Sequence, residues 1–251
     1  MKAQEIAAWL DQTLAVDQFK DYCPNGLQVD GDSRPVKKIA LAVSVTTQVI
    51  QSALDQGADL LLTHHGLFWD HQPFVATGSN HTKLQLLLNG GLALAAYHLP
   101  LDYHPRLGNH VQLAEVLGFS KIRTTGPDTQ PTGLACGSPP SQTFDTFVDH
   151  LTQIIGTQPR FSGYGPDKIN QVLIATGGAQ KEFRSAVALG ADVFLTGEGS
   201  EQNYTEAQDM GCHFVALGHH WSEQFGVKAL GIELTKQFNL ECFFIETANP
   251  F

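Results

Sequence analysis

The sequence predicts an α/β protein whose two lobes arose by internal duplication, with mostly parallel sheets flanked by helices. Residues 52–66 and 185–199 align without a gap and are identical at more than half of their positions. Each copy follows a short apolar strand and continues as helix, glycine, buried strand and turn, which is the order of a βαβ unit with parallel strands. The chain has 251 residues, of which 42% are hydrophobic, and this is enough for two cores.

An amphipathic helix is predicted at the N-terminus, because Ile6, Leu10 and Leu14 recur at helical spacing. This segment lacks the basic region and the unbroken apolar region of a signal peptide. No stretch of the chain reaches the ~18 consecutive apolar residues of a membrane-spanning helix. We therefore expect a cytoplasmic protein that does not interact with membranes.

The remaining elements follow the two copies along the chain. They are strands over 39–43, 172–175 and 242–245, and helices over 144–155 and 225–238. Loops rich in glycine and proline separate the two copies. The first lobe is therefore predicted over residues 1–122, joined by the C-terminal segment 224–251, and the second lobe over residues 123–223.

Composition argues against nucleic-acid binding. The formal net charge is -10, and the 15 lysines and arginines form no cluster, whereas nucleic-acid binding requires a basic surface. The four cysteines are scattered and form no C-x-x-C, so neither a zinc ribbon nor a thioredoxin-type site is indicated, and reduced, mostly buried thiols are expected. A locally positive metal site in so acidic a chain would attract an anionic small molecule.

Histidine is unusually frequent, with 11 residues gathered mainly in 64–110 and 213–220. The most informative stretch is Thr63-His64-His65-Gly66, which follows an apolar run. Successive side chains on a strand point to opposite faces, so these two imidazoles converge only if the strand has already ended, which Gly66 permits. Adjacent histidines at the end of a buried strand indicate a metal site.

Further ligand types follow other strand ends. Residues 90–98 resemble residues 211–219, and each stretch ends in a histidine with an acid four residues further on. The two pairs are His98 with Asp102 and His219 with Glu223. Ligands of open α/β sheets bind beyond the carboxyl ends of the strands, so we expect these side chains to come together.

Five of these residues form the predicted metal site: His64, His65, Asp102, His219 and Glu223. Three imidazoles and two carboxylates are too many for one tetrahedral zinc ion with an open position. They suit two divalent ions roughly 3.5–4 Å apart. One arrangement gives His64 and His219 to one ion and His65 and Asp102 to the other, with Glu223 bridging them. The combined charge would lower the pKa of a bridging water and favour a phosphate-bearing or carbonyl substrate.

Each of these features also has a purely structural interpretation. The two adjacent histidines can cap a helix or join a hydrogen-bond network, and Asp102 can be an N-cap or a turn residue. Pairs such as His219 and Glu223 are common on solvated helix faces. Their occurrence together at equivalent positions of a repeat favours the metal site.

Two further residues are candidates for catalysis. His98 can orient a ligand or act as an acid or base. Glu198 occupies the position of His65 in the second copy, where its carboxylate either holds a water or substrate or faces a helix N-terminus. His104 and His220 are candidates for proton transfer or for structural roles.

Several motifs together resemble the Nif-three-like dinuclear metal-centre family, whose members are often described as GTP cyclohydrolase I type 2 homologues. The motifs are Asn25-Gly26-Leu27-Gln28-Val29, Thr63-His64-His65-Gly66, Leu101-Asp102 with Gly108-Asn109, Thr196-Gly197-Glu198, and Gly218-His219 through Glu223. The resemblance covers essentially the whole chain. It implies two intertwined α/β lobes, a toroidal homohexamer with the metals facing an inner cavity, and the same five metal ligands.

The sequence therefore predicts a metal-dependent hydrolase that acts on a small nucleotide-like or heteroaromatic substrate. Metal-bound hydroxide would attack an electrophilic carbon, as when a GTP cyclohydrolase opens the purine imidazole ring at its C–N bonds. The two divalent ions per subunit can be Fe, Zn, Mn, Co or Ni, since mixed imidazole and carboxylate ligation suits all of them. The alternatives are a two-metal phosphoesterase and a non-enzymatic ring protein that binds or delivers metal.

Overall fold

The chain folds as two compact units. A computed structural model describes residues 1–70, 75–125, 134–140 and 143–251. Unit 1 consists of Met1–Asp102 and Gly226–Ala248, and unit 2 consists of Tyr103–Phe225 and Asn249–Phe251. The C-terminal helix and strand thus return to the unit that contains the N-terminus.

Unit 1 is built on a five-stranded sheet of order β1-β4-β3-β2-β11. The strands are β1 (Gly26–Val29), β2 (Lys38–Ser44), β3 (Leu60–His65), β4 (Ala93–Ala96) and β11 (Glu241–Phe244). Neighbouring strands run parallel except for β1, which is antiparallel to β4. The C-terminal strand is therefore one edge of the sheet.

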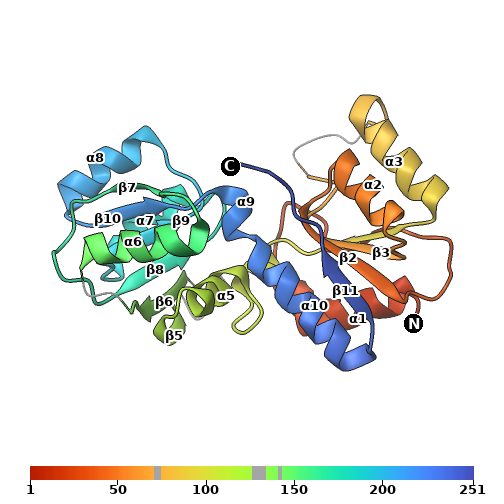
Figure 1. The fold of residues 1–251 in the computed structure, drawn as a ribbon, viewed down its shortest axis with the longest axis horizontal. Helices are drawn as coiled ribbons and strands as arrows, with labels where there is room; N and C mark the ends of the chain where they lie inside the picture. Colours follow the sequence, from red (N-terminus) through yellow and green to blue (C-terminus); the bar gives the residue numbers. More distant parts are fainter. Residues whose placement is uncertain (71–74, 126–133, 141–142) are drawn as a thin grey trace. The chain divides into compact units, whose positions relative to one another are not determined.

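Helices cover both faces of this sheet (Figure 1). They are α2 (Thr47–Asp55) and α3 (Gly78–Gly90) on one face, α1 (Ala3–Thr13) and α10 (Gln224–Phe238) on the other, and the short α4 (Leu99–Tyr103) and η1 (Val16–Gln18) in the connections. Ile50 of α2 and Leu87 of α3 share a core with Leu61 of β3. On the other face, Gly231 of α10 comes so close to Leu41 that an added Cβ would overlap its side chain.

Unit 2 is built on a six-stranded sheet of order β5-β6-β8-β9-β10-β7. The strands are β5 (Ser120–Thr125), β6 (Leu134–Ser138), β7 (Arg160–Ser162), β8 (Val172–Ala175), β9 (Val193–Thr196) and β10 (His213–Ala216). The central strands β8, β9 and β10 are parallel, and the flanking strands are antiparallel to their neighbours.

The helices of unit 2 divide between two cores, one on each face of its sheet. Helices α5 (Asn109–Val116) and α6 (Phe144–Ile155) pack on the core that contains Ile174 and Leu195, whereas α7 (Phe183–Ala188) and α8 (Glu201–Met210) pack on the core that contains Leu173 and Phe194. Short helices η2 (Gln180–Glu182) and α9 (His219–Ser222) lie in connections. Consecutive residues of β8 and β9 thus alternate between the two faces, as a buried parallel strand requires.

The two units share one topology in their central parts. The order β1-β4-β3-β2 in unit 1 corresponds to β7-β10-β9-β8 in unit 2, and in both the first strand is antiparallel and the other three are parallel. The predicted α/β class, with mixed sheets flanked by helices, is confirmed. The shared topology is consistent with the internal duplication that residues 52–66 and 185–199 indicate.

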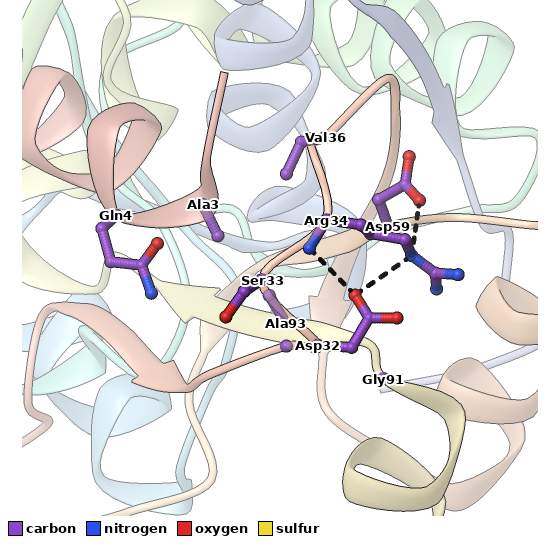
Figure 2. Close-up of a pocket in the computed structure, with 10 residues that line it drawn as sticks. Ala3, Gln4, Asp32, Ser33, Arg34, Val36, Asp59, Gly91 and Ala93 are labelled. Atoms are coloured by element: carbon purple, nitrogen blue, oxygen red, sulfur yellow. Dashed lines mark hydrogen bonds and ion pairs between the residues drawn. The ribbon is translucent and has the colours of Figure 1, made fainter.

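An aspartate connects the start of β3, the middle strand of unit 1, to the neighbouring strand β2. Asp59 Oδ2 accepts hydrogen bonds from the backbone N–H groups of Lys37 at 2.9 Å and Lys38 at 3.1 Å, which ties the entry of β3 to that of β2. Its other carboxylate oxygen lies 3.1 Å from Arg34 Nε, and Asp32 lies 3.3 Å from the same nitrogen (Figure 2). The loop before β2 is thereby attached to the sheet.

Unit 2 repeats this device at the equivalent place. Asp192 Oδ2 accepts hydrogen bonds from the backbone N–H groups of Asn170 at 2.7 Å and Gln171 at 3.0 Å, just before β8. Asp59 and Asp192 are also equivalent in the aligned copies. One carboxylate in each unit therefore sets the relative start of two neighbouring parallel strands.

None of the helices in the described ranges combines the length and the apolar character that a bilayer-spanning helix needs. All four cysteines are free thiols, and Cys23, Cys136 and Cys212 are buried, as expected from their scattered positions. Burial raises the pKa of the Cys23 thiol to about 11 and that of the Cys212 thiol to about 12, so both are protonated at neutral pH.

We expect Asp59→Ala and Asp192→Ala each to lower the free energy of unfolding by about 1–3 kcal/mol, because each leaves two backbone N–H groups without a charged acceptor. Urea denaturation followed by circular dichroism measures the change. Asp55→Ala is the control, since the Asp55 carboxylate lies at the surface of α2 and accepts a hydrogen bond from the exposed side chain of Gln51. A loss at Asp59 or Asp192 no larger than in this control would contradict the assigned role.

Candidate metal centre

The two adjacent histidines lie within β3 and not after it. The prediction that the strand has ended before His64 is wrong, because β3 stays paired with β2 as far as Ser44 and His65. Its pairing with β4 ends earlier, at Thr63 and Ala96. Beyond Thr63 only one neighbouring strand constrains the backbone, and the ring centroids of the two histidines lie 4.7 Å apart. The side chains thus converge although both residues belong to the strand.

Hydrogen bonds at Nδ1 orient both rings. His64 Nδ1 lies 3.0 Å from the carbonyl oxygen of Tyr97, and the hydroxyl of Ser44 lies 2.8 Å from His65 Nδ1. A carbonyl oxygen only accepts, so His64 carries its proton on Nδ1 and its lone pair on Nε2 when neutral. That Nε2 lies 3.6 Å from Asp102 Oδ1, and both residues are buried.

Asp21 holds the third histidine of unit 1. Its Oδ1 accepts a hydrogen bond from His98 Nδ1 at 2.9 Å, and its Oδ2 accepts the backbone N–H of Leu99 at 2.8 Å and the side-chain amide of Asn25 at 3.0 Å. Burial alone would raise the pKa of Asp21, but the hydrogen bonds from His98, Asn25 and Leu99 outweigh it and lower the pKa to about 2. The carboxylate is therefore ionised and fixes the tautomer of His98, as carboxylates do for metal-binding imidazoles.

Three imidazoles of unit 1 are placed to hold a metal ion. One ring nitrogen each of His64, His65 and His98 lies within 4.8 Å of the others. Asp102 adds a carboxylate oxygen beside His64. The ring of Trp69 meets that of His98 edge to face, with the centroids 5.3 Å apart, and shields this side of the group. Imidazole and carboxylate donors in a buried place suit divalent transition metals.

Unit 2 contains a second group, at the carboxyl ends of β9 and β10. His219 Nδ1 donates to Glu198 Oε1 at 2.7 Å, and His219 Nε2 lies 3.0 Å from the buried carboxylate of Glu223. Burial alone would lower the pKa of His219, but hydrogen bonds to Glu223 and Glu198 and their charges raise the pKa to about 9. The protonated ring sits between two carboxylates, which is a place where positive charge is stabilised.

A glycine makes room for this arrangement. Gly177, in the loop after β8, has a φ of +66°, and an added Cβ would overlap the carboxylate of Glu223 and lie 3.2 Å from His219 Nε2. The Ser222 hydroxyl accepts the Gly177 N–H at 2.9 Å, and the Gly177 carbonyl accepts the backbone N–H of Glu198 at 3.0 Å. The backbone at Gly177 therefore lies in direct contact with the candidate ligands Glu223 and His219, and only a glycine leaves room for this approach.

The predicted residues are found in these two groups. His64, His65 and Asp102 lie in unit 1 beside the predicted acid–base residue His98, and His219 and Glu223 lie in unit 2 beside the predicted Glu198. Glu198 accepts a hydrogen bond from His219 Nδ1 and so orients the ring of this candidate ligand. Buried histidine and carboxylate groups of this chain could thus hold a metal ion.

Sequence reasoning missed Asp21 and Ser44, which hold imidazole rings, and Gly177, which leaves room for Glu223 and His219. Asp21 is 77 positions from His98, and Ser44 is 21 positions from His65. No local spacing connects such pairs. Asn25 lies in one of the motifs noted above, and the structure explains it, because its side-chain oxygen accepts the backbone N–H of His98 at 2.7 Å.

A family model described as Duf34/NIF3 (NGG1p interacting factor 3) matches residues 1–250. The chain belongs to the Duf34/NIF3 family. The resemblance to the Nif-three-like family is thereby confirmed. Among curated members, a "GTP cyclohydrolase 1 type 2 homolog" of Pseudomonas aeruginosa is 41% identical over 243 residues, which cover 96% of this chain and 95% of the relative. A protein of the same name from Chlamydia pneumoniae is 36% identical over 252 residues and covers both chains completely.

Solved structures of Duf34/NIF3 relatives share the fold over the full chain. A structure described as "protein ybgI, unknown function" is 35% identical, with a TM-score of 0.94 and 100% of each chain covered. The structure of TTHA1606 from Thermus thermophilus is 32% identical, with a TM-score of 0.89 and the same coverage. The architecture described above is therefore that of the family.

The two histidines considered for proton transfer have backbone contacts in this Duf34/NIF3 chain. His104 Nδ1 accepts the N–H groups of Arg106 at 3.2 Å and Leu107 at 2.9 Å, which closes a turn. The backbone N–H of His220 donates to the backbone oxygen of Phe251 at 2.7 Å. The structural interpretation is favoured for His104.

We expect Gly177→Ala to reduce metal retention, because its Cβ would displace Glu223 in addition to straining the backbone. Metal content after dialysis, measured by mass spectrometry, tests this. Gly156→Ala is the matched control, since Gly156 has a similar φ of +80° but nothing within 4 Å of the added Cβ. Equal metal content in the two variants would contradict the role of Gly177.

We expect Asp21→Asn to weaken metal binding about 10–100-fold, the usual effect of losing a contact that orients a ring at a metal site, because His98 lies beside the candidate ligands His64 and His65 and a displaced His98 ring would disturb them. Titration with a divalent ion, followed calorimetrically, measures the affinity. The exposed Asp17→Asn changes the net charge equally and should leave the affinity unchanged. Equal affinities of the two variants would show that the contact with His98 is merely structural.

Proposed function

We propose that this chain binds two divalent metal ions through His64, His65, Asp102, His219 and Glu223, and that it hydrolyses a small nucleotide-like or heteroaromatic molecule. One observation carries the proposal: the Nδ1 atom of every histidine concerned is held by a hydrogen bond within its own unit. Folded units that fix one ring nitrogen present the other in a constant direction, as preorganised metal sites do.

Burial of the acids supports the same proposal. Asp102 and Glu223 are 6% and 3% exposed. Buried carboxylates are costly unless a cation or hydrogen-bond donors compensate them. Divalent ions at such ligands would provide this compensation and would supply Lewis acidity and water activation.

Two other side chains have the contacts needed to move protons. His98 Nδ1 is held by Asp21 Oδ1 at 2.9 Å, which fixes the orientation of the imidazole and leaves its Nε2 for proton exchange. Glu198 binds His219 through Oε1, and its side chain remains 46% exposed, so it is accessible to a substrate. We propose these two residues for acid–base catalysis, with Glu198 also orienting His219.

The name shared by the curated relatives supports a reaction of the GTP cyclohydrolase type, which acts on C–N bonds. The resemblance to the family further supports a homo-oligomer, a hexamer in toroidal form, located in the cytoplasm. Metal identity within the group Fe, Zn, Mn, Co and Ni follows availability as much as ligand type.

We expect purified protein to retain two equivalents of divalent metal per chain, and Glu223→Gln and Asp102→Asn to retain less, because each loses an anionic ligand. Elemental analysis after dialysis measures this, and circular dichroism verifies folding. Glu201→Gln, which changes an exposed acid at the start of α8, is the control. Full metal content in all variants would contradict the ligand assignment.

Turnover then distinguishes the reaction classes. Metal-loaded protein is expected to open the imidazole ring of GTP, followed by the change in ultraviolet absorbance, and Glu223→Gln is expected to be inactive. Hydrolysis of an aryl phosphate without action on GTP would identify a phosphoesterase instead. Tight metal binding without turnover of a broad panel of C–N and phosphate substrates would contradict the hydrolase proposal and favour a metal-binding ring protein.

A further inference from the structure

Unit 2 contains a cavity of about 410 Å³ beside its candidate metal ligands. Glu198, His219 and Arg160, the first residue of β7, are among the residues that line it. Further walls are Thr157, Gln158, Pro159, Leu217 and Phe251. The volume lies within the ~300–1,000 Å³ typical of sites for small molecules, and the position beyond the carboxyl ends of parallel strands is where α/β sheets bind ligands.

We propose that this cavity binds a phosphorylated small molecule and that Arg160 holds its phosphate group. The inference rests on the proposed function, whose substrate class it narrows. The ligand would place its phosphate on Arg160 and the remainder of the molecule toward His219 and Glu198.

The shared topology allows the cavity of unit 2 to be compared with the equivalent region of unit 1. Arg160 pairs with Ala216 of β10, as Gly26 of β1 pairs with Ala96 of β4 in unit 1, and Ala216 and Ala96 in turn pair with the equivalent residues Thr196 and Thr63. In unit 1 the segment before β1 contacts the side chain that follows β4, because Asp21 in this segment accepts a hydrogen bond from His98.

In unit 2 the orienting carboxylate comes from another direction. Glu198, which follows β9, binds Nδ1 of His219. The segment before β7, residues 157–159, is therefore not needed to orient that ring and lines the cavity instead. The equivalent segments thus have different roles, since the one before β1 orients a histidine and the one before β7 lines a cavity, as expected if the cavity receives a ligand.

The chemistry of the walls selects the ligand. Arg160 is exposed, and within the described residues its guanidinium takes part in no ion pair. A guanidinium offers a planar fork of donors that matches phosphate oxygens. Such a cationic group stands out in a chain of net charge -10 and would attract an anion.

The other walls fit the organic part of such a molecule. Leu217, Pro159 and Phe251 provide apolar surface, and Gln158 and Thr157 provide hydrogen-bonding groups. Small-molecule sites commonly combine apolar walls with a few placed polar groups. A phosphate monoester that carries a ring satisfies the cation and the apolar walls together, which inorganic phosphate alone does not.

Calorimetric titration of the metal-loaded protein with guanosine monophosphate and with guanosine tests the proposal, since these probes differ only in the phosphate. Wild-type protein should bind the monophosphate about tenfold more tightly, as expected for charge-assisted hydrogen bonds. Arg160→Gln should remove that difference while its guanosine affinity and metal content stay unchanged, and Arg160→Lys should restore it in part. Arg184→Gln, which changes an exposed arginine of α7, should behave as wild type.

The outcomes separate this inference from the proposed function. Equal affinities of wild type and Arg160→Gln for the monophosphate would overturn the role of Arg160, and so would absence of monophosphate binding at millimolar concentration. Loss of bound metal in Arg160→Gln would show a structural role and also overturn it. Protein that binds the monophosphate through Arg160 but retains no divalent metal would instead refute the metal centre and leave the phosphate site intact.

Discussion

The hydrogen bond at Nδ1 of each candidate histidine is the constraint on which the candidate metal centre depends. The partners are the Tyr97 carbonyl for His64, Ser44 for His65, Asp21 for His98 and Glu198 for His219. A ring held at one nitrogen presents the other in a fixed direction. All four partners belong to the same unit as their histidine, so each unit prepares its own donors when it folds.

The two units share the topology of their sheets but use different segments to orient their histidines. Asp59 and Asp192 fasten equivalent strand starts through equivalent backbone N–H groups. At the opposite strand ends the units diverge, since Asp21 approaches its histidine from the segment before β1 and Glu198 approaches from the loop after β9. The shared geometry is that of the sheet, and the variable part is the set of loops beyond it, where α/β folds place their chemistry.

The charges around His219 in unit 2 are those that the proposed binding of a divalent ion requires. His219 lies between the carboxylates of Glu198 and Glu223, whose hydrogen bonds and charges raise its pKa to about 9, so positive charge is favoured at this place. A divalent ion would meet the same demand with more charge. The close approach of Gly177 keeps Glu223 directed at that place. The chain belongs to the Duf34/NIF3 family. Metal binding would explain why its histidines and acids are gathered in these places.

The sequence by itself determined the βαβ order, the fold class, the helix over 144–155 and the histidine–acid pairs four residues apart, because these depend on periodicities of two and 3.6 residues and on one helical turn. It misjudged where β3 ends, since strand length depends on which neighbour is still paired. Tertiary structure alone brought Asp21 to His98, left room at Gly177 and opened the cavity beside Arg160. These features join residues far apart in the chain, and no local pattern encodes a contact that exists only after the strands have assembled.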